Sequence, residues 1–238
     1  MATPENRLPS TRRSKASAPA ARRARKGPAR RPRDAERSRS AILAAATAEF
    51  ADKGLGGARV DEIARRAGVN KALLYHYFGS KQALFLAVLE AVYATIRGAE
   101  AELDLESVEP PEAMERLVDF TFRYFVEHPE FITLLNSENL HRARHLKRSK
   151  RVRALHHPLI GRIAELLQRG VAAGAFRAGV DPVQLYISIA SLGYFYLSNA
   201  HTLGTVFGRN LRARAELEAR RLHVQEFVRG YLRPEPGP

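Results

Sequence analysis

The segment from 58 to 81 constrains the fold more than any other part of the chain, because its apolar residues have the spacing of two short helices joined by a tight turn. Val60 and Ile63 begin the buried face of the first helix. Gly68 follows, and glycine readily adopts the positive φ that such a turn needs. Asn70 is a favourable N-cap for the second helix. We therefore predict a helix-turn-helix in this segment.

The second of these helices has one face for the core and one face that stays free. Leu74 and Phe78 lie four residues apart and mark the packing face. The free face carries Lys71, Tyr75 and His76, a mixture of groups suited to phosphates and base edges. An ordinary αα-hairpin has the same spacing, so spacing alone leaves that alternative open. The composition of the free face favours a helix that enters the major groove of DNA.

Positive charge is concentrated at the N-terminus. The chain has 238 residues, 39 Lys and Arg against 25 Asp and Glu, and a formal net charge of +14. Residues 1–33 hold eleven of these cations and a single acid, Glu5, so this segment alone carries +10. It has too few large apolar residues to offset the entropy of ordering, and we predict a disordered basic arm. The arm would follow DNA phosphates, or it is an extension without a defined role.

The rest of the chain has helical periodicity and no pattern typical of strands. Ile42 and Phe50 share one face of a helix expected over about 34–53, and Leu84 and Val88 share one face of another. Further helices are expected from Lys81 onward and over about 112–127, 130–146, 150–173, 183–200 and 213–231. The predicted fold class is therefore all-α.

The segment from 183 to 200 is uncharged and close to the length of a membrane span. Gln184 and Ser188 make it a poor span, and Asp181 with Pro182 forms a favourable helix start in front of it. We predict an interface helix that is buried by its own domain and by a second subunit, and no membrane segment. The N-terminus lacks an apolar secretory segment and the chain has no cysteine, so the cytoplasm is the expected compartment.

The residues from 37 to about 90 resemble the TetR family in two motifs. An AAxxxF helix contains Ala45, Ala46 and Phe50, and the segment GLGGARVDEIARRAGVNKALLYHYFGSKQAL follows it. The resemblance implies a three-helix helix-turn-helix DNA-binding domain on a larger helical bundle for dimerisation and effector binding. It also implies a DNA face that consists of Arg59, Lys71, Ala72, Leu73, Tyr75, His76, Tyr77 and Lys81.

Two positions depart from the family pattern. Members usually begin the second helix with a Thr or Ser that caps it, whereas Ala58 and Arg59 stand there in this chain. Arg59 could pair with phosphate but cannot cap in the same way. Many members have His where this chain has Tyr77, which keeps a hydrogen-bonding group but changes its reach.

The C-terminal part is similar to the RutR-like branch of the same family. The similarity lies in FITLLNSENLHRARHLKRSK and DPVQLYISIASLGYFYLSNAHTLGTVFGRNL, and it implies a shared effector-domain architecture over about 110–235. That branch includes a pyrimidine-responsive regulator, but the similarity does not identify a ligand for this chain. The expected organisation is a basic arm over 1–33, a DNA-binding domain over 34–80, and an effector and dimerisation domain over 81–235.

Polar residues clustered on two of the expected helices are candidates for an effector pocket. A few converging polar groups inside an apolar bundle are typical of a small-molecule site. The same groups could instead cap helices or satisfy one another in the core. The candidates are Asn136, Glu138, Asn139, His141, His145, Tyr194, Ser198, Asn199 and His201.

Motifs for metal binding and catalysis are missing or incomplete. His141 and His145 could share a metal, and Glu138 with His141 forms a single Glu-x-x-His, but a carboxylate-bridged di-iron bundle needs that motif on two helices. The sequence has no GxSxG, no Gly-rich phosphate loop and no HExxH. We predict no metal site, no cofactor and no enzymatic activity.

Two functions fit these observations. The first is a transcriptional regulator, expected to be a repressor, that binds a pseudo-palindromic operator in double-stranded DNA as a homodimer and is released by a small-molecule effector. The second is a sequence-tolerant DNA-binding protein whose affinity comes mainly from the basic arm and which has no ligand switch.

Overall fold

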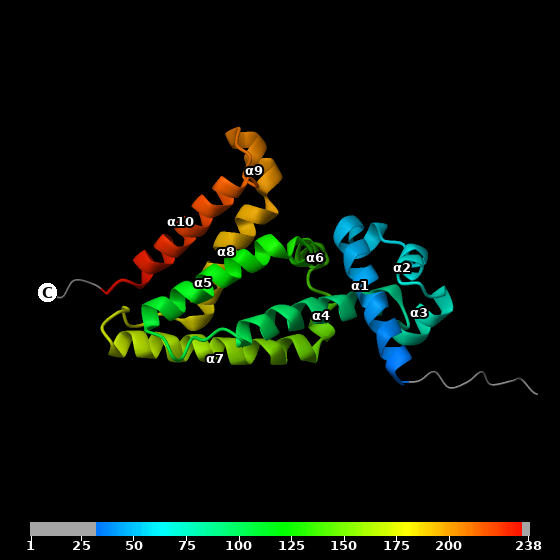
Figure 1. Ribbon diagram of the computed structural model, residues 1–238, viewed down its shortest axis with the longest axis horizontal. Coiled ribbons are helices and arrows are strands. Elements are labelled where there is room, and N and C mark those ends of the chain that lie inside the picture. The colour runs from blue at the N-terminus through cyan, green and yellow to red at the C-terminus, as the bar shows by residue number, and fades with distance from the viewer. Residues whose placement is uncertain (1–31, 235–238) are drawn as a thin grey trace, which may run out of the picture.

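The computed structural model of the protein describes residues 32–234. Most of the predicted basic arm, residues 1–31, lies outside this range. Within it every regular element is a helix, which confirms the predicted all-α fold. The helices form a small N-terminal head at one end and a longer bundle that extends away from it (Figure 1).

The head is built from three helices and the first half of a fourth. These are α1 (Pro32–Gly57), α2 (Val60–Arg66), α3 (Lys71–Phe78) and α4 (Lys81–Ala101). Phe50 of α1 and Phe85 of α4 are fully buried, and their rings meet edge to face with centroids 5.1 Å apart. The core of the head therefore continues into α4.

The bundle contains the second half of α4 and six further helices. They are α5 (Pro110–Glu127), α6 (Pro129–Leu140), α7 (Lys150–Ala172), α8 (Pro182–Ser198), α9 (Ala200–Phe207) and α10 (Arg214–Leu232). Helix α7 runs beside α4, and α8 and α10 pack on α5 (Figure 1). Leu117, Ile163 and Ile189 meet in the apolar core between these helices.

The helix expected over 130–146 ends at Leu140, which corrects that prediction. Arg142 and Ala143 take positive φ values of 56° and 55°, and a short 3₁₀ helix, Leu146–Arg148, follows them. The buried carboxylate of Glu138 accepts hydrogen bonds from the backbone N–H groups of His145 and Leu146, at 2.8 and 2.9 Å. The carboxylate thus satisfies two backbone N–H groups that have no helical partner where the helix ends.

The uncharged helix begins at Pro182 as expected but ends at Ser198. Asp181 is its N-cap and accepts a hydrogen bond from the Gln184 N–H at 2.7 Å. Asn199 donates from its side-chain amide to the carbonyl of Phe195 and separates α8 from α9. The separate helix α9 is absent from the sequence-based expectation.

Among the described residues, α4 is the one helix long and apolar enough to cross a membrane by length and composition. Its apolar side chains have partners within the protein, since Leu84 and Leu89 pack in the head and Ile96 packs in the bundle. Packing therefore accounts for the apolar character of α4.

A buried ion pair lies in the second half of α4. Arg97 Nη2 is 2.8 Å from Glu100 Oε1, and the two residues are 6% and 1% exposed. Burial raises the pKa of Glu100 to about 7 from 4.5, although the charges of Arg97 and, across on α7, Arg162 work against this rise. Tyr186 of α8 faces the same pair and accepts a hydrogen bond from Arg97 Nη2 at 2.7 Å. Glu100 therefore favours its neutral form more in the folded protein than in the unfolded chain.

We predict that Glu100 makes the protein less stable as pH rises from about 4.5 through 7. Between these values the folded state binds the extra proton, so the contribution of Glu100 is full below pH 4.5 and is lost above 7. Glu100→Gln removes this dependence. Relative to the unsubstituted protein, the variant should gain up to about 3 kcal/mol in free energy of unfolding between pH 5 and pH 8, as measured by urea denaturation. Exposed Glu102→Gln is the control, and an equal gain there would contradict the prediction.

Candidate nucleic-acid interface and effector site

The turn between α2 and α3 has the geometry of a helix-turn-helix. Gly68 takes φ 65°, a left-handed conformation that favours glycine. Asn70 accepts a hydrogen bond from the Leu73 N–H at 2.7 Å and caps α3. Leu74 is fully buried and Phe78 is nearly so. Helix α3 is therefore held at its start by the cap and along its length by two apolar anchors.

A buried glutamate of α1 fastens the start of α2. Glu49 is fully buried and accepts a hydrogen bond from the backbone N–H of Arg59 at 3.2 Å. Lys53 and Arg66 lie 3.0 and 3.4 Å from the same carboxylate. Burial tends to raise the pKa of Glu49, but these hydrogen bonds and charges together outweigh it and lower the pKa. Glu49 thus holds the backbone of Arg59, the N-cap residue of α2, whose own side chain makes no capping hydrogen bond.

The predicted DNA residues divide into exposed and half-buried positions. Arg59, Lys71, Ala72, Tyr75 and His76 are exposed, whereas Leu73, Tyr77 and Lys81 are half-buried. Tyr77 packs against the core of the head. The Lys71 amine lies 2.9 Å from Asp61 Oδ1, and this hydrogen bond raises the pKa of Lys71. Lys81 donates to the carbonyl of Gly56 at 3.3 Å.

Two arginines of α2 are already engaged with an acid of the same helix. Glu62 Oε1 lies 2.7 Å from Arg65 Nη2 and 2.8 Å from Arg66 Nε. Hydrogen bonds from both arginines lower the pKa of Glu62 to about 2. Arg65 and Arg66 are therefore held by an ion pair within α2.

Arg39 of α1 is a further candidate for a DNA contact, and it was not among the residues predicted from the sequence. Its guanidinium lies over the Phe78 ring, 5.5 Å from the centroid, and so stands beside the end of α3. Arg39 occurs among several charged residues at the start of a helix, and only its contact with the Phe78 ring in the folded head distinguishes it from them. The spacing of the basic residues alone carried no such signal.

Four of the predicted effector residues come together between α6, α8 and α9. Asn136 accepts a hydrogen bond from the Tyr194 hydroxyl and donates one to Ser198 Oγ at 3.0 Å. Asn136, Ser198 and His201 line a small cavity of about 130 Å³ with apolar walls that include Phe125. Burial raises the pKa of Tyr194, so its hydroxyl stays protonated and can donate.

The other predicted effector residues have structural partners or lie apart. Glu138 and His145 are buried together, with Glu138 Oε2 2.6 Å from His145 Nδ1. His141 makes a ring hydrogen bond to the carbonyl of Ser137 at 2.7 Å, and Asn199 ends α8. Asn139 is exposed near Tyr194. No group of three potential metal ligands occurs in the described part of the chain.

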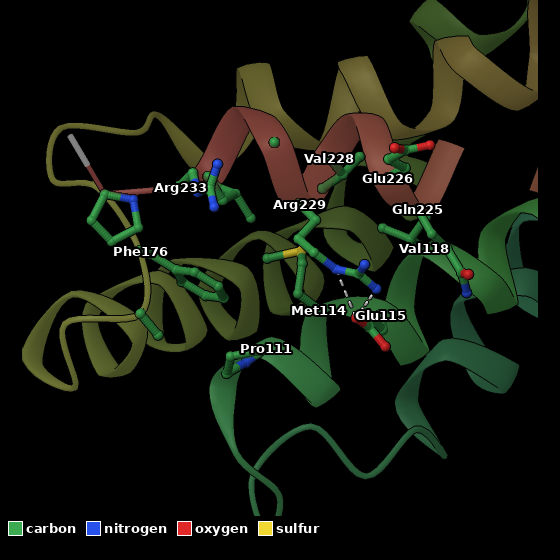
Figure 2. Close-up of a pocket in the computed structure, with 14 residues that line it drawn as sticks. Pro111, Met114, Glu115, Val118, Phe176, Gln225, Glu226, Val228, Arg229 and Arg233 are labelled. Atoms are coloured by element: carbon green, nitrogen blue, oxygen red, sulfur yellow. Dashed lines mark hydrogen bonds and ion pairs between the residues drawn. The ribbon is translucent and has the colours of Figure 1, made fainter. Parts of the chain in front are cut away.

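A larger groove of about 580 Å³ lies between α5 and α10 and contains none of the predicted residues. Figure 2 shows Met114, Val118 and Phe176 along it, with Arg229 of α10 directed toward Glu115 of α5. Arg229 Nε is 3.1 Å from Glu115 Oε1, so the two charges across the groove already pair with each other. The start of α5 and the C-terminal end of α10, which line the groove, lie at the end of the bundle away from the head (Figure 1).

Family models match both parts of the chain. Residues 42–88 match the model of bacterial regulatory proteins of the tetR family, and residues 110–228 match the tetracyclin repressor-like C-terminal domain. The first range covers most of the head and the start of α4. The second covers the bundle from α5 into α10.

Individual relatives and a solved structure agree with these matches. The chain is 41% identical over 181 residues to the HTH-type transcriptional repressor NicS of Pseudomonas putida, covering 76% of this chain and 85% of the relative. It is 28% identical over 211 residues to the HTH-type transcriptional regulator RutR of Escherichia coli strain K12, covering 86% and 95%. A tetR-family regulatory protein from Rhodococcus RHA1 has the same fold, with a TM-score of 0.64, 17% identity, and coverage of 84% of this chain and 98% of that one. The chain therefore belongs to the TetR family and is a DNA-binding transcriptional regulator, not an enzyme.

Proposed function

We propose that the protein is a cytoplasmic repressor that binds a pseudo-palindromic operator as a homodimer and leaves it when a small-molecule effector binds. The observation that carries the proposal is the exposed face of α3, with Lys71, Tyr75 and His76 on a helix whose other face is anchored by buried Leu74. A rigid helix with such a face can present hydrogen-bonding groups to a major groove. The relative NicS is named a repressor, which supports the direction of regulation.

The proposed DNA contacts divide into positioning and reading groups. Lys71, Arg59 and Lys81 would contact phosphates, and Lys71 must first exchange its ion pair with Asp61 for a phosphate. Tyr75 is 39% exposed and stands with His76 on the outer face of α3, where hydrogen-bonding side chains can reach base edges. Ala72, Leu73 and Tyr77 would shape the apolar contact around these groups.

The proposed dimer forms through α8 and α10, which pack side by side on α5. Val183, Ile187 and Phe195 recur at steps of four or eight along α8 and stay exposed. Leu222, Phe227 and Tyr231, separated by five and four residues, are also exposed on α10. An exposed apolar surface of this extent is typical of a subunit interface. Ile189, by contrast, points into the core of its own subunit.

Release would follow from movement of α4. Two heads of a dimer must meet two major grooves about one helical turn apart, so a small rotation of either head weakens binding. Helix α4 belongs to both the head and the bundle, and a ligand in the bundle can act through it. A coupling free energy of about 1–3 kcal/mol is ordinary for such a switch.

We predict that Tyr75→Ala weakens binding to DNA from upstream of the protein's own gene by about tenfold, because one base-edge or phosphate contact is lost. The melting temperature should not change, since Tyr75 is exposed. Leu74→Ala on the same helix is the contrasting variant, and it should lower the free energy of unfolding by about 2–5 kcal/mol. Fluorescence anisotropy and thermal unfolding measure the two effects. Full affinity in Tyr75→Ala would contradict the assignment of α3 as the reading helix.

We predict that Ile187→Asp converts the dimer to a folded monomer, because a carboxylate would be buried without a partner at the interface. Light scattering at several protein concentrations measures the mass, and circular dichroism checks the helices. Leu140→Asp is the control, since Leu140 is 82% exposed and belongs to α6, which is not part of the proposed α8 and α10 surface. A dimeric Ile187→Asp variant would place the interface elsewhere.

We expect tight binding to the upstream fragment and weak binding to a scrambled fragment, and this difference should survive deletion of the basic arm, residues 1–33. Anisotropy titrations at two salt concentrations test it, and the truncated chain should show a shallower salt dependence because phosphate contacts of the arm are removed. Equal affinity for both fragments that disappears with the arm would favour the alternative, a sequence-tolerant protein whose affinity comes mainly from the basic arm, residues 1–33.

A further inference from the structure

We propose that Arg97 anchors a binding site for a small carboxylic acid with an apolar or aromatic body, in the interior of the bundle between α4 and α8. This inference rests on the proposed effector function and gives it a location and a ligand class. The site is separate from the Asn136 cluster and from the groove between α5 and α10.

The guanidinium of Arg97 carries the argument because it is buried and incompletely paired. Its Nη2 donates to the Tyr186 hydroxyl and contacts Glu100, but Nε and Nη1 have no hydrogen-bond partner in the described part of the chain. Neither oxygen of Glu100 completes a well-aligned hydrogen bond. Buried polar groups in native proteins nearly always have partners, so free donors at this depth indicate an absent acceptor. A planar fork of N–H donors matches a carboxylate in two-point geometry.

The surroundings of Arg97 define the rest of the ligand. The Tyr186 ring lies against the guanidinium, with 5.3 Å between the centroid and Cζ. Ile96 and Tyr124 are buried together in one apolar cluster, and half-buried Tyr93, one turn of α4 before Arg97, packs against it. Tyr93 and Tyr124 both lie close enough to Arg97 for its charge to act on them. Aromatic and apolar walls around one charged anchor are the usual composition of a small-molecule site. They suit an acid with an apolar body better than a sugar or a phosphate.

The carboxylate would replace the Tyr186 hydroxyl as the acceptor of Arg97. Tyr186 is only partly buried on α8, so rotation of its side chain can open a path from the surface to Arg97. Burial raises the pKa of Glu100 to about 7, so below that pH the group is mostly neutral and adds little repulsion toward an anion. A pocket of this kind is populated only when the ligand holds it open.

The position of Arg97 also links the site to the DNA-binding head. Arg97 and Lys81 lie on the same helix, sixteen residues or about 24 Å apart at 1.5 Å per residue. Arg162 of α7 holds the end of α4 through a hydrogen bond to the carbonyl of Glu100 at 2.8 Å. A ligand that changes how α4 sits against α7 and α8 therefore moves the helix that enters the head.

The test uses the full-length protein in Bis-Tris buffer at pH 6, where Glu100 is mostly neutral and the probes are ionised. The four probes are acetate, hexanoate, benzoate and phenylacetate, each beside its neutral amide. We expect calorimetry and thermal unfolding to detect at least one acid and not its amide. Arg97→Gln should lower the affinity for that acid by about 10-fold to 100-fold, because hydrogen bonds to a charged group are lost. Exposed Arg123→Gln on α5 removes the same charge and should leave the affinity unchanged. Binding of no acid, equal binding of acid and amide, or full affinity in Arg97→Gln would overturn the proposal.

Tyr186→Phe is a second variant that avoids loss of a buried charge. It removes the hydroxyl that competes for Arg97 Nη2, so the acid should bind at least as tightly as before. Loss of binding in this variant would show that the acid does not replace the hydroxyl and would overturn the proposal.

Anisotropy with the upstream DNA fragment separates this site from the proposed function. Weaker DNA binding with the acid present, abolished by Arg97→Gln, supports both. If an acid binds at Arg97 but the affinity for DNA does not change, the binding site is supported. Release of DNA through that site is then contradicted. If the protein binds the operator but none of the acids, the proposed regulatory function is supported and the proposed site at Arg97 is contradicted.

Discussion

The structure depends on one constraint, that α4 must pack in two cores at once. Its first half contributes Leu84 and Phe85 to the head, and its second half contributes Ile96 to the bundle. A continuous helix transmits displacement along its axis because its backbone hydrogen bonds resist bending. The head therefore cannot change its orientation without a change in how α4 lies against α7 and α5. This mechanical link makes a ligand switch physically possible in the chain.

Buried charges mark the points where the helices are joined, and they differ in how well they are satisfied. Glu49 receives a backbone N–H and two cations and fastens α1 to α2. Glu138 receives two backbone N–H groups and the ring of His145 and supports the turn after α6. Arg97 with Glu100 is the least satisfied of the three, because within the described residues four of their buried atoms lack a hydrogen-bond partner, against one oxygen of Glu49. A buried charge with all its hydrogen bonds made favours one arrangement of the helices around it. A buried charge with free donors can gain further hydrogen bonds from a ligand, which contribute to the free energy of binding.

Local sequence signals predicted the elements that depend on local interactions. The positive φ at Gly68, the cap at Asn70 and the helix start at Asp181 all occur within a few residues of the signal that predicted them. The helix predicted over 130–146 was wrong beyond Leu140, because a carboxylate folded back from Glu138 competes with continued helix. Periodicity cannot detect a competitor of that kind. Periodicity also cannot show which face of α8 belongs to the proposed dimer surface, since α8 is apolar on both its buried and its exposed faces.

The sequence by itself determined the all-α class, the helix-turn-helix, the family and the set of polar residues available for a ligand. Each of these depends on residue type and on spacing within one helix or across one turn. The tertiary structure decided which polar residues meet. It brought Asn136 to Tyr194, paired Glu138 with His145 as a structural group, and left Arg97 buried with free donors beside Tyr186. These pairings join residues that packing alone brings together, most of them far apart in the chain, and the burial that gives them their chemistry exists only once the helices are assembled.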